Sequence, residues 1–284
     1  MNKTISKLPD NATWKQYNSD GEAAHFYHAN GFPVGVYSIL LNNLSQTFNL
    51  SALGWRATWP GIGKPPKRRD WEIYADDLIA FIERQYKHPI IGMGHSMGAT
   101  CTVLAAEKRP DLFKSLVLIE PAMVSRPLAR LVRILPKMIM NITEPAKSTL
   151  KKQELWDSRE SFLAFCKKYR GYKRFDDEAF QTMAQYGVVE TQDGRFKLGF
   201  PKVWEAHNYT QPPNILANLE RLKIPCIAIR GKSSVFFTEA IWQEWQARCP
   251  NTIFKENLNF GHLLPLENPM ICSELIGAGL SEIS

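Results

Sequence analysis

The chain has 284 residues, enough for one large hydrophobic core with an inserted segment. Hydrophobic residues make up 44% and charged residues 22%, a balance that excludes wholesale disorder. Most of the formal charge of +7 arises between Arg126 and Lys152, where seven basic residues face one acid. Because the rest of the chain is nearly neutral, we expect no nucleic acid partner.

The composition also bears on compartment and cofactors. No run of about eighteen apolar residues occurs, and residues 1–14 contain no apolar stretch resembling a secretory signal. The five cysteines show neither CxxC nor Cys/His metal spacing, so we expect reduced cysteines, a cytoplasmic protein and no metal. Gly61-Ile62-Gly63 lacks the third glycine of a dinucleotide site, and we expect no organic cofactor.

Short apolar runs alternate with helical patterns along residues 1–120 and again along residues 219–284. This alternation predicts an α/β fold with a mostly parallel central sheet and helices on both faces. Helices are expected at 71–84 and after residue 269, where apolar residues recur at the helical period. The expected strands are 13–17 at an edge, 24–28, 48–53, 89–93, 115–120, 225–230 and 252–256.

Residues 121–218 interrupt this alternation with helical patterns, aromatic clusters and prolines. We predict that they form a helical lid inserted between two parts of one core, residues 1–120 and 219–284. Near Leu128 and Leu131, apolar residues interleave with arginines, so two hypotheses stay open. The lid helix there either rests on an anionic membrane or carries arginines that are merely solvated.

The candidate nucleophile is Ser96, in Gly94-His95-Ser96-Met97-Gly98 between an apolar strand and a helix. This is the GxSxG nucleophile elbow in its required context, a sharp turn that exposes the serine oxygen above the sheet. Glycine is needed on both sides because a β-carbon would collide with neighbouring backbone.

A serine hydroxyl is a weak nucleophile near pH 7 and needs an adjacent base, for which histidine has a matching pKa. Of six histidines, His262 follows the last expected strand, on a loop that can reach the elbow. His95 lies beside the nucleophile, but its side chain should point to the other side of the turn, so we expect a packing role.

With these motifs in hand, the chain resembles the α/β-hydrolase superfamily over nearly its whole length. The resemblance rests on the ordered motifs His28-Ala29-Asn30-Gly31-Phe32-Pro33, Gly94 to Gly98, and Gly261-His262 with Glu267-Asn268-Pro269 behind it. It implies an oxyanion hole formed by the backbone N–H groups of Phe32 and Met97. It also implies a substrate pocket beside Phe32, Asn30 and His28, although Asn30 stands where the family usually has histidine.

The acid departs from the usual pattern. Such hydrolases usually place an aspartate after the strand that ends here at Arg230, and residues 231–237 contain no carboxylate. Some members, including haloalkane dehalogenases, carry the acid one strand earlier, where Glu120 ends residues 115–120. We predict Glu120 as the acid, because a buried carboxylate needs a partner such as His262. Glu239 is the alternative, and a salt bridge from Glu120 to Arg126 is the structural alternative.

These residues favour a serine hydrolase that cleaves a carboxylic ester of a small molecule through an acyl-enzyme. Carbon–carbon bond hydrolysis and acyl transfer use the same serine and stay open. A binding module of the same fold that has lost its acid is the non-catalytic alternative. Dehalogenation and epoxide opening use an aspartate nucleophile, which Ser96 argues against. A monomer or a homodimer is expected.

Overall fold

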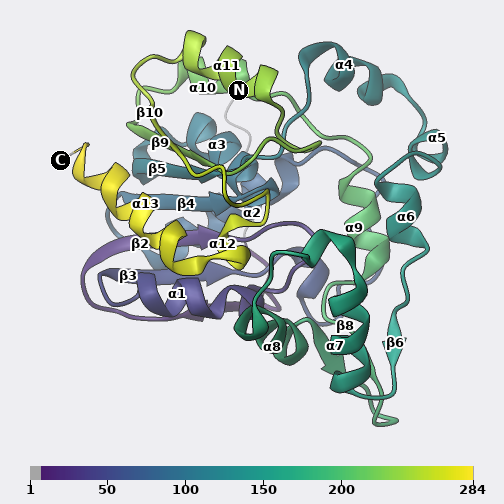
Figure 1. Cartoon of the computed structure of the whole chain (residues 1–284). Coiled ribbons are helices and arrows are strands. Elements are labelled where there is room, and N and C mark those ends of the chain that lie inside the picture. The colour runs from purple at the N-terminus through teal and green to yellow at the C-terminus, as the bar shows by residue number, and fades with distance from the viewer. Residues whose placement is uncertain (1–7, 284) are drawn as a thin grey trace.

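A central sheet of seven strands organises the computed structural model, which describes residues 8–283 (Figure 1). The strand order is β1-β3-β2-β4-β5-β9-β10, and all neighbours are parallel except the antiparallel pair of β1 and β3. Each predicted strand is present within two residues of its expected bounds. The strands are β1 (Trp14–Gln16), β2 (Glu22–Tyr27), β3 (Phe48–Leu53), β4 (Ile90–His95), β5 (Phe113–Ile119), β9 (Cys226–Arg230) and β10 (Ile253–Glu256).

Helices cover both faces of this sheet, as the alternation of patterns predicts. All six residues of β4 are buried, which is typical of a parallel strand covered on both sides. One hydrophobic cluster joins the sheet to α1 (Ser38–Leu44) and α13 (Pro269–Ser281). The cluster on the other face involves α2 (Glu72–Gln85), α3 (Met97–Lys108), α10 (Leu216–Arg221) and α11 (Glu239–Arg248).

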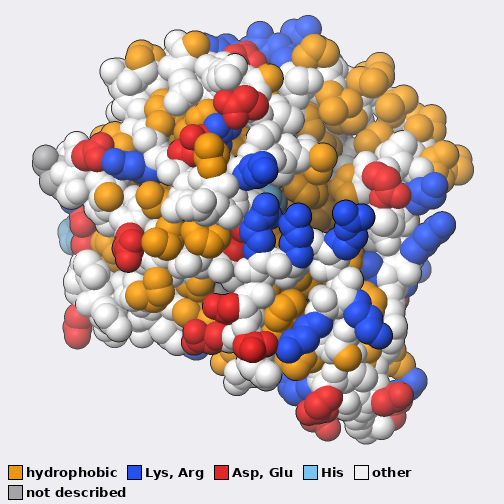
Figure 2. Space-filling model, viewed as in Figure 1, with side chains coloured by type: hydrophobic (Ala, Val, Ile, Leu, Met, Phe, Trp, Pro, Cys, Tyr) orange, Lys and Arg blue, Asp and Glu red, His pale blue; other side chains and the backbone are white. Residues whose placement is uncertain are grey.

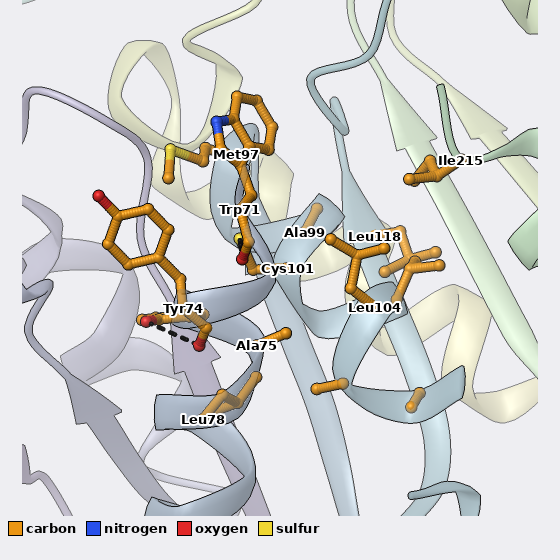
Figure 3. Close-up of a cluster of buried hydrophobic side chains, with 14 of the residues drawn as sticks. Trp71, Tyr74, Ala75, Leu78, Met97, Ala99, Cys101, Leu104, Leu118 and Ile215 are labelled. Carbon is orange, nitrogen blue, oxygen red and sulfur yellow. Dashed lines mark hydrogen bonds between the residues drawn. The ribbon is translucent and has the colours of Figure 1, made fainter. Parts of the chain in front are cut away.

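Figure 3 shows part of this second cluster, where Trp71 lies beside Met97 and Leu104 lies below Ile215. Trp71 directly precedes α2, Met97 and Leu104 belong to α3, and Ile215 directly precedes α10, so one apolar cluster joins the helix behind the elbow to both its neighbours. Short helical turns complete the core. They are η1 (Val34–Tyr37), η2 (Arg56–Thr58), η3 (Pro110–Leu112) and α12 (Leu264–Glu267).

The segment between β5 and β9 contains residues 121–218, which we call the insertion. The sequence predicts a helical insertion, but the structure shows that the insertion is not purely helical. A three-stranded antiparallel sheet, in the order β6-β8-β7, lies within it. Its elements are α4 (Arg126–Ile134), α5 (Lys137–Asn141), α6 (Ala146–Leu150), β6 (Leu155–Trp156), α7 (Arg159–Lys168), η4 (Arg170–Tyr172), α8 (Asp177–Tyr186), β7 (Val188–Glu190), β8 (Phe196–Leu198) and α9 (Lys202–Asn208).

The hairpin of β7 and β8 shows why the sequence pattern did not predict this small sheet. Its turn is closed by the N–H of Thr191, which donates to the carbonyl of Arg195 at 2.8 Å. Gly194 has a φ of +77°, in the left-handed region that glycine tolerates best. Asp-Gly is a strong hairpin signal, but the flanking strands are only three residues each, too short to show an alternating pattern.

Residues 8–283 contain neither a membrane-spanning helix nor a cluster of metal-binding side chains. No helix in this range is both long and apolar enough to span a bilayer. No three His, Cys, Asp or Glu side chains in the same range are grouped so that they could hold a metal ion. All five cysteines are free, and four of them are buried.

Candidate active site

The parallel register brings two predicted site residues to the same edge of the sheet. Gly94 pairs with Leu118, and His95 with Ile119, so Ser96 and Glu120 are the next residues on neighbouring strands. The N–H of Ser96 donates to the carbonyl of Ile119 at 2.9 Å. Ser96 and Glu120 are the two non-glycine residues within 8–283 that have positive φ, at 54° and 48°. Such backbone strain is concentrated at functional sites because surrounding structure must hold it.

Glycines make the turn at Ser96 sterically feasible. A β-carbon on Gly94 would lie 2.6 Å from the amide nitrogen of Ala99. A β-carbon on Gly98 would overlap the carbonyl oxygen of Tyr27 at the end of β2. Both contacts are with backbone, which cannot move aside as a flexible side chain could. The elbow therefore packs α3 directly against the sheet, with Ser96 at the N-terminus of the helix.

The imidazole of His262 lies between the serine and the glutamate. Its Nε2 is 2.9 Å from the hydroxyl oxygen of Ser96, and its Nδ1 is 2.9 Å from Oε2 of Glu120. A carboxylate only accepts hydrogen bonds, so Nδ1 carries the proton and the lone pair of Nε2 faces the serine hydroxyl. This arrangement can remove a proton from Ser96 and stabilise the imidazolium that results.

Glu120 is held on both oxygens. Its side chain is 1% exposed, and Oε1 accepts a hydrogen bond from the N–H of Gly231 at 2.5 Å. The alternative acid, Glu239, instead pairs with Arg230 at 2.8 Å and is half exposed. Arg126 makes no salt bridge with Glu120, which contacts His262. The structure thus places Glu120, and not Glu239, against the imidazole.

A second histidine supports the first, a role that the sequence did not reveal. The Nε2–H of His95 donates to the carbonyl of His262 at 2.8 Å. Its Nδ1 accepts from the hydroxyl of Tyr37 at 2.7 Å, and that hydroxyl accepts from the N–H of Ala29. Burial lowers the pKa of His95 to about 3, so the ring is neutral at physiological pH. His95 therefore fixes the backbone of His262.

Glu267 anchors the same loop from the other side. Its Oε2 accepts a hydrogen bond from the N–H of Gly261 at 2.5 Å, and Arg174 lies 3.8 Å from Oε1. Burial raises the pKa of this carboxyl, while the Gly261 amide opposes the shift. The sequence indicates Glu267 only as part of the motif behind His262, because its contact depends on the turn of α12, which short-range patterns do not encode.

The loop after β2 is held by hydrogen bonds inside the protein. His28 is fully buried, donates from Nδ1 to the carbonyl of Ala29 and accepts at Nε2 from the N–H of Trp55. Asn30 donates to the carbonyl of Glu205 and accepts from Asn208, both in α9. These contacts occupy the groups that were expected to face the substrate, so His28 and Asn30 hold the loop in place.

The backbone N–H groups of Phe32 and Met97 are unoccupied. Within residues 8–283, neither amide donates to a protein acceptor. Met97 directly follows the serine at the start of α3, where the helix dipole favours negative charge. The Phe32 ring is half-buried and lies 6.2 Å from that of Tyr172 in the insertion.

Further aromatic rings surround the imidazole. Phe236 lies 4.9 Å from His262, ring centroid to centroid, and Tyr209 stacks on Phe236. Figure 2 shows a hollow on one face, bordered by hydrophobic side chains over α4 and α5 and by a row of basic side chains. The residues between the strand ends and the insertion therefore combine apolar surface with positive charge.

A mostly parallel sheet with this strand order, helices on both faces and a serine at a strand-to-helix elbow defines the α/β-hydrolase fold. The chain has this fold. The model of the family described as "Serine aminopeptidase, S33" matches residues 56–178, which include the elbow and Glu120.

Sequence relatives match parts of the chain. Monoglyceride lipase of Rattus norvegicus is 26% identical over 141 residues, covering 46% of each protein. The 2-(acetamidomethylene)succinate hydrolase of Mesorhizobium japonicum is 34% identical over 96 residues, covering 34% of each. The chain thus spans less than half the length of either relative in these matches.

Solved structures match almost all of the fold. A crystal structure of E-2-(acetamidomethylene)succinate hydrolase has a TM-score of 0.79 at 21% identity, covering 95% of both chains. A thermophilic esterase from Thermogutta terrifontis has a TM-score of 0.68 at 17% identity, covering 96% of this chain and 93% of the esterase. At these identities the likeness concerns the fold alone.

Proposed function

We propose that this α/β-hydrolase cleaves a carboxylic ester through an acyl-enzyme, with Ser96, His262 and Glu120 as its catalytic residues. The observation that carries the proposal is the continuous chain of 2.9 Å contacts from the serine oxygen through the imidazole to Glu120. In an acyl-transfer mechanism, His262 takes the proton of Ser96 as the oxygen attacks the ester carbonyl. His262 then returns this proton to the leaving alcohol, and water releases the acid by the reverse sequence.

The tetrahedral intermediate needs donors for its oxyanion, and we assign these to the N–H groups of Met97 and Phe32. Their support is that neither donates to an acceptor within residues 8–283 and that both segments adjoin the elbow. Backbone amides suit this role because they are oriented before the reaction begins. The ring of Phe32 would then border the acyl group, beside Tyr172.

The decisive experiment measures turnover of p-nitrophenyl butyrate by the wild type and three variants. Ser96→Ala and Glu120→Gln should each lower kcat by about 10³-fold or more, because the serine, the base and the acid act as one unit. Glu239→Gln is the matched control and should retain wild-type kcat, since that carboxylate pairs with Arg230 away from the imidazole.

Two outcomes would contradict the proposal. Equal activity of Ser96→Ala and wild type would remove the serine from the mechanism. Absence of wild-type turnover on p-nitrophenyl esters and on a monoacylglycerol would remove ester cleavage. In that second case, reaction of Ser96 with a fluorophosphonate probe separates a serine enzyme of another specificity, such as carbon–carbon cleavage or acyl transfer, from a binding module.

The small-molecule substrate is supported by the superfamily, whereas compartment and assembly stay predictions. Five unpaired cysteines support a reducing compartment, and we propose the cytoplasm. A monomer or a homodimer remains our expectation for the assembly.

A further inference from the structure

Helix α4 has two faces of opposite character. Arg126, Arg130 and Arg133 follow the i, i+4, i+7 spacing that places side chains on one face of a helix. Leu128 and Leu131 lie on the opposite face, and both are more than two-fifths exposed. An interfacial membrane helix likewise carries basic residues on its polar face and apolar residues on the other, so the two faces of α4 alone do not identify its partner. The surroundings of the arginine face are therefore the observation that bears on its ligand.

The arginine face of α4 borders a cavity of about 470 Å³. The floor of the cavity is apolar and includes Trp71 and Leu104, which are 4% and 6% exposed. Four arginines are among its lining residues, namely Arg68 and the three arginines of α4. We call this space the arginine cleft. Its volume falls within the usual range for small-molecule sites, about 300–1,000 Å³.

The acids of the arginine cleft are already paired. Asp70 binds Arg68 at 2.5 Å, and Glu72 binds Lys108 at 2.6 Å. By contrast, within the described part of the chain, no carboxylate lies within salt-bridge distance of the arginines on α4. Glu220, on the neighbouring α10, is bound by Arg248 at 2.6 Å. Three guanidinium groups thus border an apolar floor without a fixed counter-charge.

The arginine cleft is distinct from the candidate active site. Ser96, Glu120, His262 and Phe236 are not among its lining residues. Leu104 lies eight residues after Ser96 along α3, which corresponds to about 12 Å of helix. A ligand in the cleft would contact the outer side of α3 and the arginine face of α4, not the serine hydroxyl.

We propose that the arginine cleft binds a phosphate-bearing ligand. Guanidinium groups offer paired N–H donors that match phosphate oxygens and stay charged at all physiological pH values. The three arginines of α4 span about 10 Å of helix, enough to contact more than one phosphate group. The apolar floor at Trp71 and Leu104 would receive the organic part of the ligand.

The test uses pyrophosphate as the probe, in isothermal titration calorimetry at constant ionic strength. We expect one saturable site in the wild type. The double variant Arg130→Gln/Arg133→Gln should weaken the affinity at least tenfold, because two charge-assisted contacts are lost. Arg84→Gln, an exposed arginine near the other end of α2, is the matched control and should bind like the wild type.

Two further arms identify the ligand source and the independence of the site. Sedimentation with phosphatidylglycerol vesicles, against phosphatidylcholine vesicles, tests a lipid headgroup, and loss of this binding in the double variant would assign the cleft to lipid phosphate. Ser96→Ala should bind the probe as the wild type does, whatever its effect on ester turnover. The proposal fails if neither probe binds the wild type, or if the double variant binds both unchanged. Urea unfolding of the double variant, expected to match the wild type, excludes misfolding.

Discussion

The polar side chains at the strand ends are hydrogen-bonded within the protein, whereas those on helix α4 face solvent. At the strand ends, Ser96, Glu120 and His262 each have hydrogen-bond partners, and a neutral, buried His95 supports them from behind. On α4, charged and large apolar side chains alike face solvent, with Ile134 78% exposed. In the first region, the side chains of these residues are oriented by hydrogen bonds within the protein. In the second region, the exposed arginines and apolar side chains of α4 are available to a partner outside the chain, as we propose for the arginines.

The largest expected change in stability is steric and tests how tightly the elbow is packed. Gly98→Ala should destabilise the protein by about 4 kcal/mol or more, because the added β-carbon meets the carbonyl oxygen of Tyr27 and neither backbone can yield. Gly277→Ala is the matched control, since nothing lies within 4 Å of its β-carbon position on α13. That variant should be stabilised by up to about 1 kcal/mol.

Urea unfolding followed by circular dichroism measures both glycine variants. A Gly98→Ala protein as stable as the wild type would show that α3 has room to move away from β2. The elbow would then be less constrained than its close contacts indicate.

The nucleophile elbow could be predicted from the sequence, because the glycines that its close packing requires lie beside Ser96 in the chain. A strand, a turn with glycine at both required positions and a helix follow one another within twenty residues, so local patterns encode the feature completely. Glu120 was also within reach, because a carboxylate that ends a buried strand needs a partner. Its contact with His262 joins residues that are 142 positions apart.

Other supports of the site left no local signal. The link from Tyr37 through His95 to the carbonyl of His262 depends on how η1 packs under the elbow, which no periodicity reports. The burial of His28 and Asn30 likewise depends on contacts with Trp55 and α9. In the insertion, strands of two or three residues are too short for an alternating pattern to emerge.

An intermediate effect concerns the buried histidine. His95 has its pKa lowered to about 3 by burial, against an ordinary value near 6.5. Below pH 6.5 the unfolded chain therefore binds a proton at this position that the folded chain does not. This contribution to stability is complete above about pH 6.5 and is lost as the pH falls toward 3, with a slope of up to about 1.4 kcal/mol per pH unit.

The His95→Gln variant isolates that slope from other titrating groups. Its free energy of unfolding should fall less steeply than that of the wild type between pH 6 and pH 4, even if it is lower at pH 7. The exposed His88→Gln is the control and should keep the wild-type slope. Parallel curves for His95→Gln and the wild type would mean that the ring binds its proton in the folded protein.

The smallest expected effect lies on α4, where Ile134 and Val132 are 78% and 4% exposed on the same helix. Ile134→Ala should change the free energy of unfolding by no more than about 0.5 kcal/mol, because this side chain is mostly exposed to water in both the folded and the unfolded state. Val132→Ala removes buried methyl groups and should cost about 1–3 kcal/mol. Urea unfolding at two protein concentrations measures both. A loss at Ile134 as large as at Val132, and growing with concentration, would show that this apolar face is covered by a second copy of the chain.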